Sequence, residues 1–160
     1  MESVDVGIES AGKTSILYKS RLGKRVQIIP TLGFNVETIE FNETKLTIWD
    51  LGGHDRMLPY WPCYFSNTDA IIFVVDSSDR DRIVEANEQL YKLLNHDDLK
   101  DIPFLILANK QDLPDIMSVE EISAKLYLDS INNREWYIQG TSGITSEGID
   151  RGLDWLTSVL

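Results

Sequence analysis

The chain has 160 residues, 42% of them hydrophobic and 26% charged, which is the composition of one soluble globular domain. Its formal net charge of −11 argues against nucleic acid as a general partner, because an acidic surface repels a polyanion. The single cysteine, Cys63, excludes an internal disulfide and fits a reducing compartment, so we expect a cytoplasmic protein.

Strand-like and helix-like segments alternate along the chain. Strands are predicted at 3–6, 34–41, 45–51, 70–76, 103–109 and 135–140. Helices are predicted at 13–22, 79–99, 118–127 and 148–160. The second and third strands are predicted to pair as a hairpin across the residues NET. This alternation predicts an α/β domain with a largely parallel sheet, in which ligands bind beyond the carboxyl ends of the strands.

Residues 7–14, GIESAGKT, satisfy the pattern G-x-x-x-x-G-K-[ST] of a phosphate-binding loop. Gly7 and Gly12 permit backbone angles that let the loop turn its N–H groups toward phosphate oxygens at the start of a helix. Lys13 can reach the β- and γ-phosphates, and the hydroxyl of Thr14 can bind magnesium. The alternative is a glycine-rich turn that only caps a helix.

Asp5 is the exception in the predicted first strand, SVDV. Aspartate is unfavourable inside a central strand, because its short charged side chain does not pack well on a pleated, buried surface. We therefore expect the first strand to be frayed or truncated.

The predicted strand PFLILA runs directly into the residues NKQD. Asp112 can accept two hydrogen bonds from the ring N–H and the exocyclic amine of guanine, a pair of donors that adenine lacks. The aliphatic stem of Lys110 can cover the base, and Asn109 can tie this loop to the phosphate loop. The alternative is a polar strand-to-helix turn without a ligand.

Two further motifs have the chemistry to sense a γ-phosphate. In WDLGG, Asp50 can hold magnesium through water and the N–H of Gly53 can donate to the phosphate. In IPTLGFN, the hydroxyl of Thr31 can complete the metal shell when the γ-phosphate is present. Each motif alone is also typical of an ordinary turn.

Together the motifs GIESAGKT, PTLGFNVET, WDLGG, NKQD and TSG resemble those of a small GTPase. The stretches IPTLGFNVETIEF, FVVDSSDRDRI, LANKQDLPD and GLDWL are similar to the ADP-ribosylation factor (Arf) and Arf-like family. The resemblance covers nearly the whole chain and implies a single G domain over residues 1–160. It implies the P-loop small-GTPase fold, a mixed and mostly parallel six-stranded sheet with helices on both faces. It also implies binding of GTP or GDP with Mg²⁺, and a switch cycle run by exchange factors, GTPase-activating proteins and effectors.

The resemblance also implies which residues form the site. The nucleotide-binding positions are Glu9, Ser10, Ala11, Gly12, Lys13, Thr14, Ser15, Thr31, Gly53, Asn109, Lys110, Asp112, Ser142 and Gly143. The magnesium positions are Thr14, Thr31 and Asp50. Phe34, Trp49 and Tyr64 match an aromatic triad that binds effectors in the GTP form. Their hairpin positions alone would instead place Phe34 and Trp49 in the core.

His54 departs from the family, which usually has Gln directly after GG to orient the attacking water. A neutral imidazole has one donor and one acceptor but a different reach from an amide. With Lys13 and Gly53 as the other catalytic positions, we expect very slow hydrolysis without a partner. No arginine-finger motif stands in the chain, so we expect a partner to supply that group. Alternatively, His54 is a tolerated loop residue.

Two other departures from the family concern the N-terminal helix and the second switch. The amphipathic, myristoylated N-terminal helix of Arf proteins is missing, because six residues precede Gly7. We therefore expect no membrane anchor in this chain, and a monomer that is cytoplasmic or peripheral at the Golgi or other internal membranes. Pro62 falls where the second switch is often helical, and it should break or cap such a helix.

The resemblance predicts a GTPase switch that regulates intracellular vesicle trafficking, and two rival functions remain open. One is a recruitment module that binds GTP with negligible hydrolysis, which only His54 supports. The other is an ATP-using phosphotransferase with the same phosphate loop, against which NKQD argues.

Overall fold

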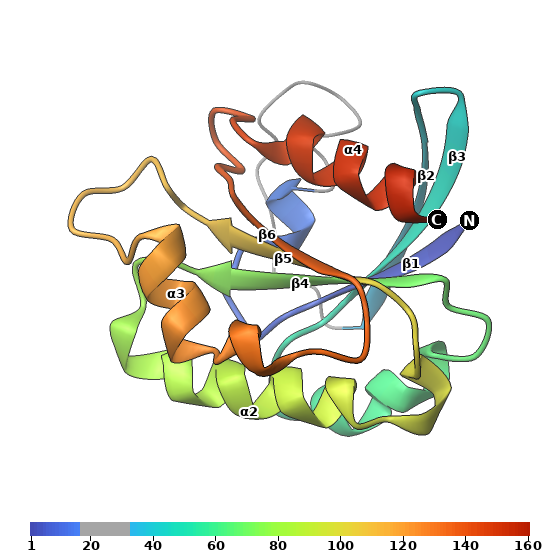
Figure 1. The fold of residues 1–160 in the computed structure, drawn as a ribbon, viewed down its shortest axis with the longest axis horizontal. Helices are drawn as coiled ribbons and strands as arrows, with labels where there is room; N and C mark the ends of the chain where they lie inside the picture. Colours follow the sequence, from blue (N-terminus) through green and yellow to red (C-terminus); the bar gives the residue numbers. More distant parts are fainter. Residues whose placement is uncertain (17–32) are drawn as a thin grey trace.

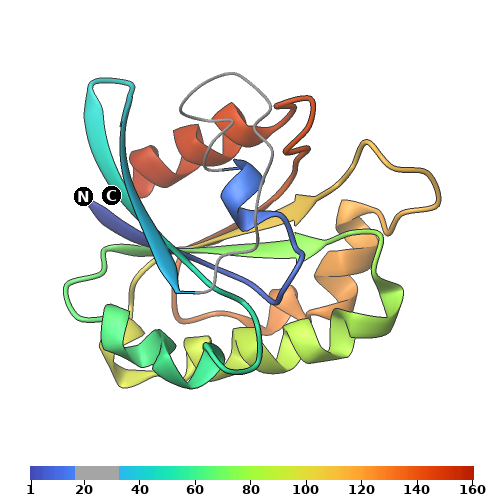
Figure 2. The same ribbon diagram turned by 180° about the vertical axis from the view of Figure 1, so that it is seen from behind.

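The computed structural model describes residues 1–16 and 33–160 of the chain. They form one six-stranded sheet between two layers of helices (Figures 1 and 2). The strands are β1 (Glu2–Val6), β2 (Phe34–Phe41), β3 (Thr44–Leu51), β4 (Ala70–Asp76), β5 (Phe104–Asn109) and β6 (Trp136–Gly140). The helices are α2 (Ile83–Leu94), α3 (Val119–Lys125) and α4 (Ile149–Val159), and residues 13–16 begin a further helix. Short 3-10 helices are η1 (Leu58–Tyr64), η2 (Arg80–Arg82), η3 (Asp97–Leu99) and η4 (Leu128–Ser130).

The strands follow the order β2-β3-β1-β4-β5-β6 across the sheet. Only β2 and β3 run antiparallel, as the predicted hairpin, and every other neighbouring pair is parallel. The α/β class and the mixed, mostly parallel six-stranded sheet are therefore confirmed. The strands β4 and β5 were predicted from continuous apolar runs. Both are buried along almost their whole length, as expected for strands covered on both faces.

Alternating side chains of the sheet supply two separate apolar layers. Phe73 and Ile106 belong to the layer beneath α2 and α3, where Leu90 of α2 is fully buried. Ile72 belongs to the opposite layer, against which α4 packs through Leu153 and its helical neighbours. Figures 1 and 2 show α2 and α3 on one face of the sheet and α4 on the other. The helices bury these faces because their apolar residues recur every three or four positions.

The expectation that the first strand is frayed is wrong. β1 spans five residues and pairs with β3 on one side and β4 on the other, so it is central in the sheet. Its Asp5 is buried and faces a narrow apolar cavity beside Ile48 and Ile72. Burial raises the pKa of the Asp5 carboxyl, and the charge of Asp50 raises it further while Lys13 opposes the shift. Ladder hydrogen bonds on both edges thus hold a strand that side-chain propensity disfavours.

The predicted motifs meet at one edge of the sheet, because parallel strands present their carboxyl ends together. β1 leads into the loop that begins at Gly7, and β3 leads to Gly52. β4 ends at Asp76, β5 ends at Asn109 and β6 leads to Thr141. Loops that are far apart in the sequence are therefore neighbours in space.

Two helix boundaries differ from the sequence prediction. The helix predicted from residue 79 begins as η2, and α2 proper starts at Ile83, after Asp79 accepts a hydrogen bond from the backbone N–H of Arg82. Pro62 lies inside η1, whose 3-10 turns tolerate it, so it neither ends nor caps that segment. Within the described residues, no helix has both the length and the apolar character needed to cross a membrane.

Candidate functional site

The phosphate loop is organised around the ammonium group of Lys13. Its Nζ is buried and donates to the carbonyl oxygens of Gly7 at 2.9 Å and Ile8 at 3.2 Å. Burial lowers the pKa of Lys13, and the charges of Asp5 and Asp50 counteract that shift. An ammonium carries three donors, and the two carbonyls account for two of them. The geometry holds a cation at the centre of the loop with a donor available to an anion.

Gly12 is required by both backbone angle and space. Its φ is +97°, a conformation that residues with a side chain rarely adopt. A Cβ at this position would lie 2.3 Å from Nδ2 of Asn109. The second glycine of the motif therefore lets the loop after β5 approach the phosphate loop.

Asn109 connects three segments with one buried side chain. Its Nδ2 donates to the carbonyl of Ala11 at 2.9 Å. Its Oδ1 accepts from the backbone N–H of Gly143 at 3.1 Å and from Oγ1 of Thr141 at 3.3 Å. The prediction that Asn109 ties its loop to the phosphate loop agrees with this geometry, and the third connection, to the TSG loop, is additional.

The predicted guanine-reading carboxylate of Asp112 is exposed, and one of its oxygens is held by a neighbour. Oγ of Ser142 donates to Oδ1 of Asp112 at 2.7 Å, and Ser142 itself is buried. The same Ser142 oxygen accepts from the backbone N–H groups of Ile144 and Thr145. Ser142 thus orients the carboxylate and leaves acceptor positions for a ligand, because a carboxylate has about four lone-pair sites.

The sequence prediction for Lys110 concerned only its stem, and the structure adds a partner for its ammonium group. Its backbone is left-handed, with φ at +67°, and its Nζ lies 2.5 Å from Oδ2 of Asp76 at the end of β4. Burial raises the pKa of Asp76, but hydrogen bonds from Lys110 and Ser78 outweigh that effect and leave the pKa below its usual value. The ion pair fixes the direction of the Lys110 stem across the mouth of the loop.

A cavity lies between the phosphate loop, the NKQD loop and the TSG loop. Its lining joins predicted nucleotide residues from all three segments with two apolar neighbours: Gly12, Ser15, Asn109, Lys110, Asp112, Leu113, Gly143 and Ile144. A lining that combines polar groups with the apolar side chains of Leu113 and Ile144 suits a planar heterocycle with hydrogen-bonding edges.

Two of the three predicted magnesium residues lie in contact. Oγ1 of Thr14 and Oδ2 of Asp50 are 2.5 Å apart, and both residues are buried. Nδ2 of Asn35 also donates to that Asp50 oxygen, at 3.3 Å. A hydroxyl beside a carboxylate is an oxygen donor set that fits magnesium, which takes few protein ligands and completes its shell with phosphate and water. The third residue, Thr31, lies outside the described residues.

Gly53 brings the DLGG segment onto the phosphate loop. A Cβ at this position would lie 2.2 Å from the carbonyl oxygen of Gly7 and 2.7 Å from the backbone nitrogen of Glu9. Only glycine permits that approach. It brings the next residue, His54, close to the phosphate loop. His54 is half-buried, and its carbonyl accepts from the backbone N–H groups of Met57 and Leu58 at the start of η1.

The three aromatic residues predicted as an effector surface do form a cluster. The ring centroids of Phe34, Trp49 and Tyr64 are 5.4 to 5.9 Å apart in all three pairs. Phe34 is 49% exposed, so the alternative that it belongs to the core is wrong. Trp49 and Tyr64 are partly buried against the core and form the base of the cluster.

Three residues of the site were not predicted from the sequence. Asp76 pairs with Lys110, and Trp61 donates from Nε1 to the carbonyl of Gly52 at 2.9 Å. Arg82 donates to the carbonyl of Glu9, 73 residues away along the chain. The position of Asp76 at the carboxyl end of a predicted strand could have marked it, whereas the contacts of Trp61 and Arg82 depend on tertiary structure.

Comparison with known proteins agrees with this geometry. The model of the ADP-ribosylation factor family matches residues 1–160. Among solved structures, the chain is similar to the Arl6 (BBS3) small GTPase from Trypanosoma brucei, determined with a bound nucleotide analogue, GppNp. The identity is 30% and the TM-score 0.92, over 99% of this chain and 96% of that one. This chain belongs to the ADP-ribosylation factor family of small GTPases, whose members bind guanine nucleotides.

Proposed function

We propose that this protein is a GTP/GDP switch of the Arf type that regulates intracellular vesicle trafficking and hydrolyses GTP slowly without an activating partner. The observation that carries the proposal is the bond from Asn109 to Ala11, which joins the guanine-reading loop to the phosphate loop. Asp112 and Gly12 line the same cavity, which suits a ligand that joins a hydrogen-bonding base to a polyphosphate.

The base end selects guanine by hydrogen-bond complementarity. Asp112 presents a carboxylate that Ser142 already orients, and guanine offers it two N–H donors on one edge. Adenine would leave that carboxylate without those partners, which costs about 1–3 kcal/mol or more. The Lys110 stem, directed by Asp76, covers one face of the base.

The phosphate end combines a cation with backbone donors. Lys13 reaches the β- and γ-phosphates, and the N–H groups from Glu9 to Ser15 surround them at the start of the helix that begins at residue 13. Thr14 and Asp50 would hold the magnesium ion, with Thr31 as the predicted third ligand. When bound, magnesium supplies positive charge that offsets the phosphate oxygens.

The reaction is attack of a water oxygen on the γ-phosphorus of GTP. The bond from that phosphorus to the β–γ bridging oxygen breaks, and GDP and inorganic phosphate leave. Lys13 and the N–H of Gly53 stabilise the negative charge that develops, and His54 orients the water less effectively than an amide would. An arginine supplied by a partner would accelerate the step by about 10³–10⁵-fold.

Nucleotide specificity tests the proposal directly. We expect Asp112→Asn to move the preference from GTP toward xanthosine triphosphate, because the amide presents a donor where the carboxylate accepted. Asp115→Asn, an exposed aspartate in the same loop, is the matched control and should leave the preference unchanged. We expect Lys13→Ala to lose tight nucleotide binding. A GTP preference that survives Asp112→Asn, measured by competition against labelled nucleotide, would contradict the proposal.

A recruitment module with negligible hydrolysis is the second candidate, and His54 is the observation in its favour. Both functions share the nucleotide site and the aromatic cluster of Phe34, Trp49 and Tyr64, which would bind effectors in the triphosphate form. A time course of GTP hydrolysis with an added activating partner separates them, since the module would show no acceleration.

Membership of the ADP-ribosylation factor family supports the proposed trafficking role and the proposed location. We propose a monomer that is cytoplasmic and associates peripherally with the Golgi or other internal membranes in its GTP form. Imaging of the tagged protein in cells tests this. Wild type should label such membranes, and Lys13→Ala should be diffuse because it cannot be loaded.

A further inference from the structure

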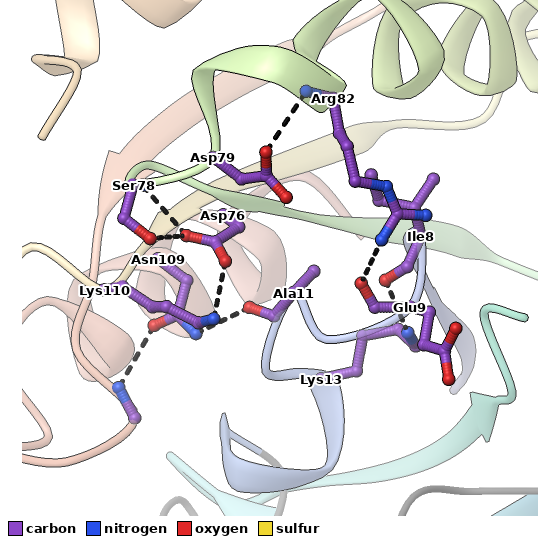
Figure 3. Close-up of polar contacts among 11 residues, drawn as sticks. Ile8, Glu9, Ala11, Lys13, Asp76, Ser78, Asp79, Arg82, Asn109 and Lys110 are labelled. Atoms are coloured by element: carbon purple, nitrogen blue, oxygen red, sulfur yellow. Dashed lines mark hydrogen bonds and ion pairs between the residues drawn. The ribbon is translucent and has the colours of Figure 1, made fainter.

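The side chain of Arg82 reaches from η2 to the back of the phosphate loop. Its Nη1 donates to the carbonyl oxygen of Glu9 at 3.2 Å, as Figure 3 shows. The segment from Asp76 to Arg82 therefore touches both nucleotide loops, since Asp76 at its other end pairs with Lys110. Sequence motifs assign no role to either contact.

Arg82 is held in place from two directions. Its Nε lies 2.9 Å from Oε2 of Glu85 and its Nη2 lies 3.1 Å from Oε1 of the same residue. Its backbone N–H donates to Oδ1 of Asp79 at 3.2 Å. A carboxylate that binds a guanidinium through two parallel bonds fixes the plane of the group, so the N–H bonds of Nη1 point in fixed directions.

The carbonyl that Arg82 binds controls an exposed and strained part of the loop. Ser10 has a φ of +66°, which is uncommon for a residue with a side chain and persists only where the surroundings enforce it. A peptide unit is planar and trans, so the N–H of Ser10 points opposite to the carbonyl of Glu9. By holding that carbonyl, Arg82 sets the direction of the Ser10 N–H.

Asn109 does the same for the next part of the loop. Its bond to the carbonyl of Ala11 sets the direction of the Gly12 N–H in the same way. The segment between Glu9 and Gly12 is thus held by a side chain at each end, both from outside the loop.

We propose that Arg82, locked by Glu85, is a positioning residue of the phosphate loop: it orients the Glu9–Ser10 peptide for phosphate binding and slows nucleotide release. This inference rests on the proposed function, because it assigns a support to the same site. Arg82 contacts the backbone of the phosphate loop, so its role is to fix the geometry that the backbone donors need.

Arg80 provides a matched control within the same 3-10 turn. Its Nη1 pairs with Oε1 of Glu121 on α3 at 2.5 Å, and its side chain is 50% exposed. Arg80→Ala removes the same charge and a similar side chain from η2 without touching the phosphate loop.

The experiment measures release of fluorescent GDP from the full chain after excess unlabelled GDP is added. We expect Arg82→Ala to accelerate release about tenfold, the order of magnitude of one charge-assisted hydrogen bond. Arg80→Ala should stay within about twofold of wild type. Glu85→Gln keeps the arginine but weakens its anchor, so its release rate should fall between those of wild type and Arg82→Ala. The acceleration should persist at high salt, because a fixed hydrogen bond is screened far less than a surface charge.

Two further readouts separate positioning from general stabilisation. Arg82→Lys keeps the charge but cannot bind both Glu85 oxygens and the Glu9 carbonyl together, so it should behave like Arg82→Ala. The amide resonance of Ser10 in the GDP form should shift in both Arg82 variants and stay in place in Arg80→Ala. Release from Arg82→Lys at the wild-type rate, or an unmoved Ser10 amide, would overturn the inference. A wild-type protein that binds no guanine nucleotide would instead overturn the proposed function.

Discussion

Nδ2 of Asn109 donates to the carbonyl oxygen of Ala11 at 2.9 Å, across 98 residues of sequence. Through this bond the loop that reads the base and the loop that binds phosphate share one buried side chain. Because Oδ1 of the same residue accepts from Gly143, the third loop of the site moves with them. Nucleotide affinity and local stability should therefore depend on Asn109 together.

The first prediction separates the contribution of the Asn109 amide nitrogen from that of its amide oxygen. We expect Asn109→Ala to lower both GDP affinity and the free energy of unfolding by about 2–4 kcal/mol, because it removes hydrogen bonds to the buried Ala11 and Thr141 and to the partly buried Gly143. Asn109→Asp keeps the acceptor toward Gly143 but places a carboxylate oxygen against the Ala11 carbonyl. Isothermal titration and urea unfolding should show that Asn109→Asp loses most of the same affinity. Near wild-type affinity in Asn109→Asp would mean that the link to Ala11 is unimportant.

The second prediction concerns the chemistry at His54. We expect His54→Gln to increase the single-turnover rate of GTP hydrolysis, because an amide can accept from the water and donate to the phosphate from a more flexible side chain. Asp55→Asn, at the exposed neighbouring position, should leave the rate unchanged. Rapid-quench measurement with radiolabelled GTP checks both. An equal or lower rate in His54→Gln would show that histidine at position 54 is not the cause of slow hydrolysis.

The third prediction is that Asp5 destabilises the protein. No described residue forms a hydrogen bond to its Oδ1, and the carboxyl faces an apolar cavity in the sheet. We expect Asp5→Val to raise the free energy of unfolding by about 1–3 kcal/mol, since it removes a buried polar group and adds a residue that favours strands. Asp5→Asn should raise the free energy of unfolding by less than Asp5→Val does, because it removes the charge but keeps a buried polar group.

The raised pKa of Asp5 gives that gain a pH dependence. A carboxyl whose folded pKa is above its unfolded value stabilises the fold fully below the unfolded pKa and loses that contribution as the pH rises through the folded pKa. The advantage of Asp5→Val should therefore be larger at neutral pH than at pH values near the ordinary aspartate pKa. Urea unfolding in saturating GDP at several pH values measures it, and an advantage that shrinks as pH rises would contradict the assignment.

The fourth prediction has the opposite sign and concerns Asp76. Hydrogen bonds from Lys110 and Ser78 outweigh burial and keep the pKa of Asp76 below its usual value of 3.8. Its stabilisation is present above the unfolded pKa and is lost as the pH falls through the folded pKa. Asp76→Asn should destabilise the protein by about 1 kcal/mol at neutral pH, because the amide faces the Lys110 ammonium.

That difference between wild type and Asp76→Asn should vanish in acid. Asp79→Asn is a useful comparison on the same loop, because it changes a carboxylate that caps η2 and does not meet Lys110. Unfolding curves from acid to neutral pH, at constant saturating GDP, give both differences. A difference for Asp76→Asn that stays constant down to strongly acid pH would show that the ion pair with Lys110 does not stabilise the fold.

The sequence by itself determined the class of fold and the main chemical groups of the site. Apolar runs at 70–76 and 103–109 predicted the buried strands β4 and β5, because a strand covered on both faces must be apolar throughout. The spacing GIESAGKT marked the phosphate loop, and the motif NKQD marked Asn109, Lys110 and Asp112. These signals are local, since a few adjacent residues specify each turn and its ligand.

Only the tertiary structure decided how the local elements support one another. The sequence predicted a frayed first strand from Asp5, but pairing with β3 and β4 outweighs the poor strand propensity of one residue. The sequence did not decide whether Phe34 lies in the core or on the surface. In the structure Phe34 is the first residue of β2 and is exposed. Arg82 meets Glu9, and Asp76 meets Lys110, because parallel strands bring distant loops to one edge of the sheet. Contacts across such distances carry no sequence pattern, since their geometry exists only after the sheet has formed.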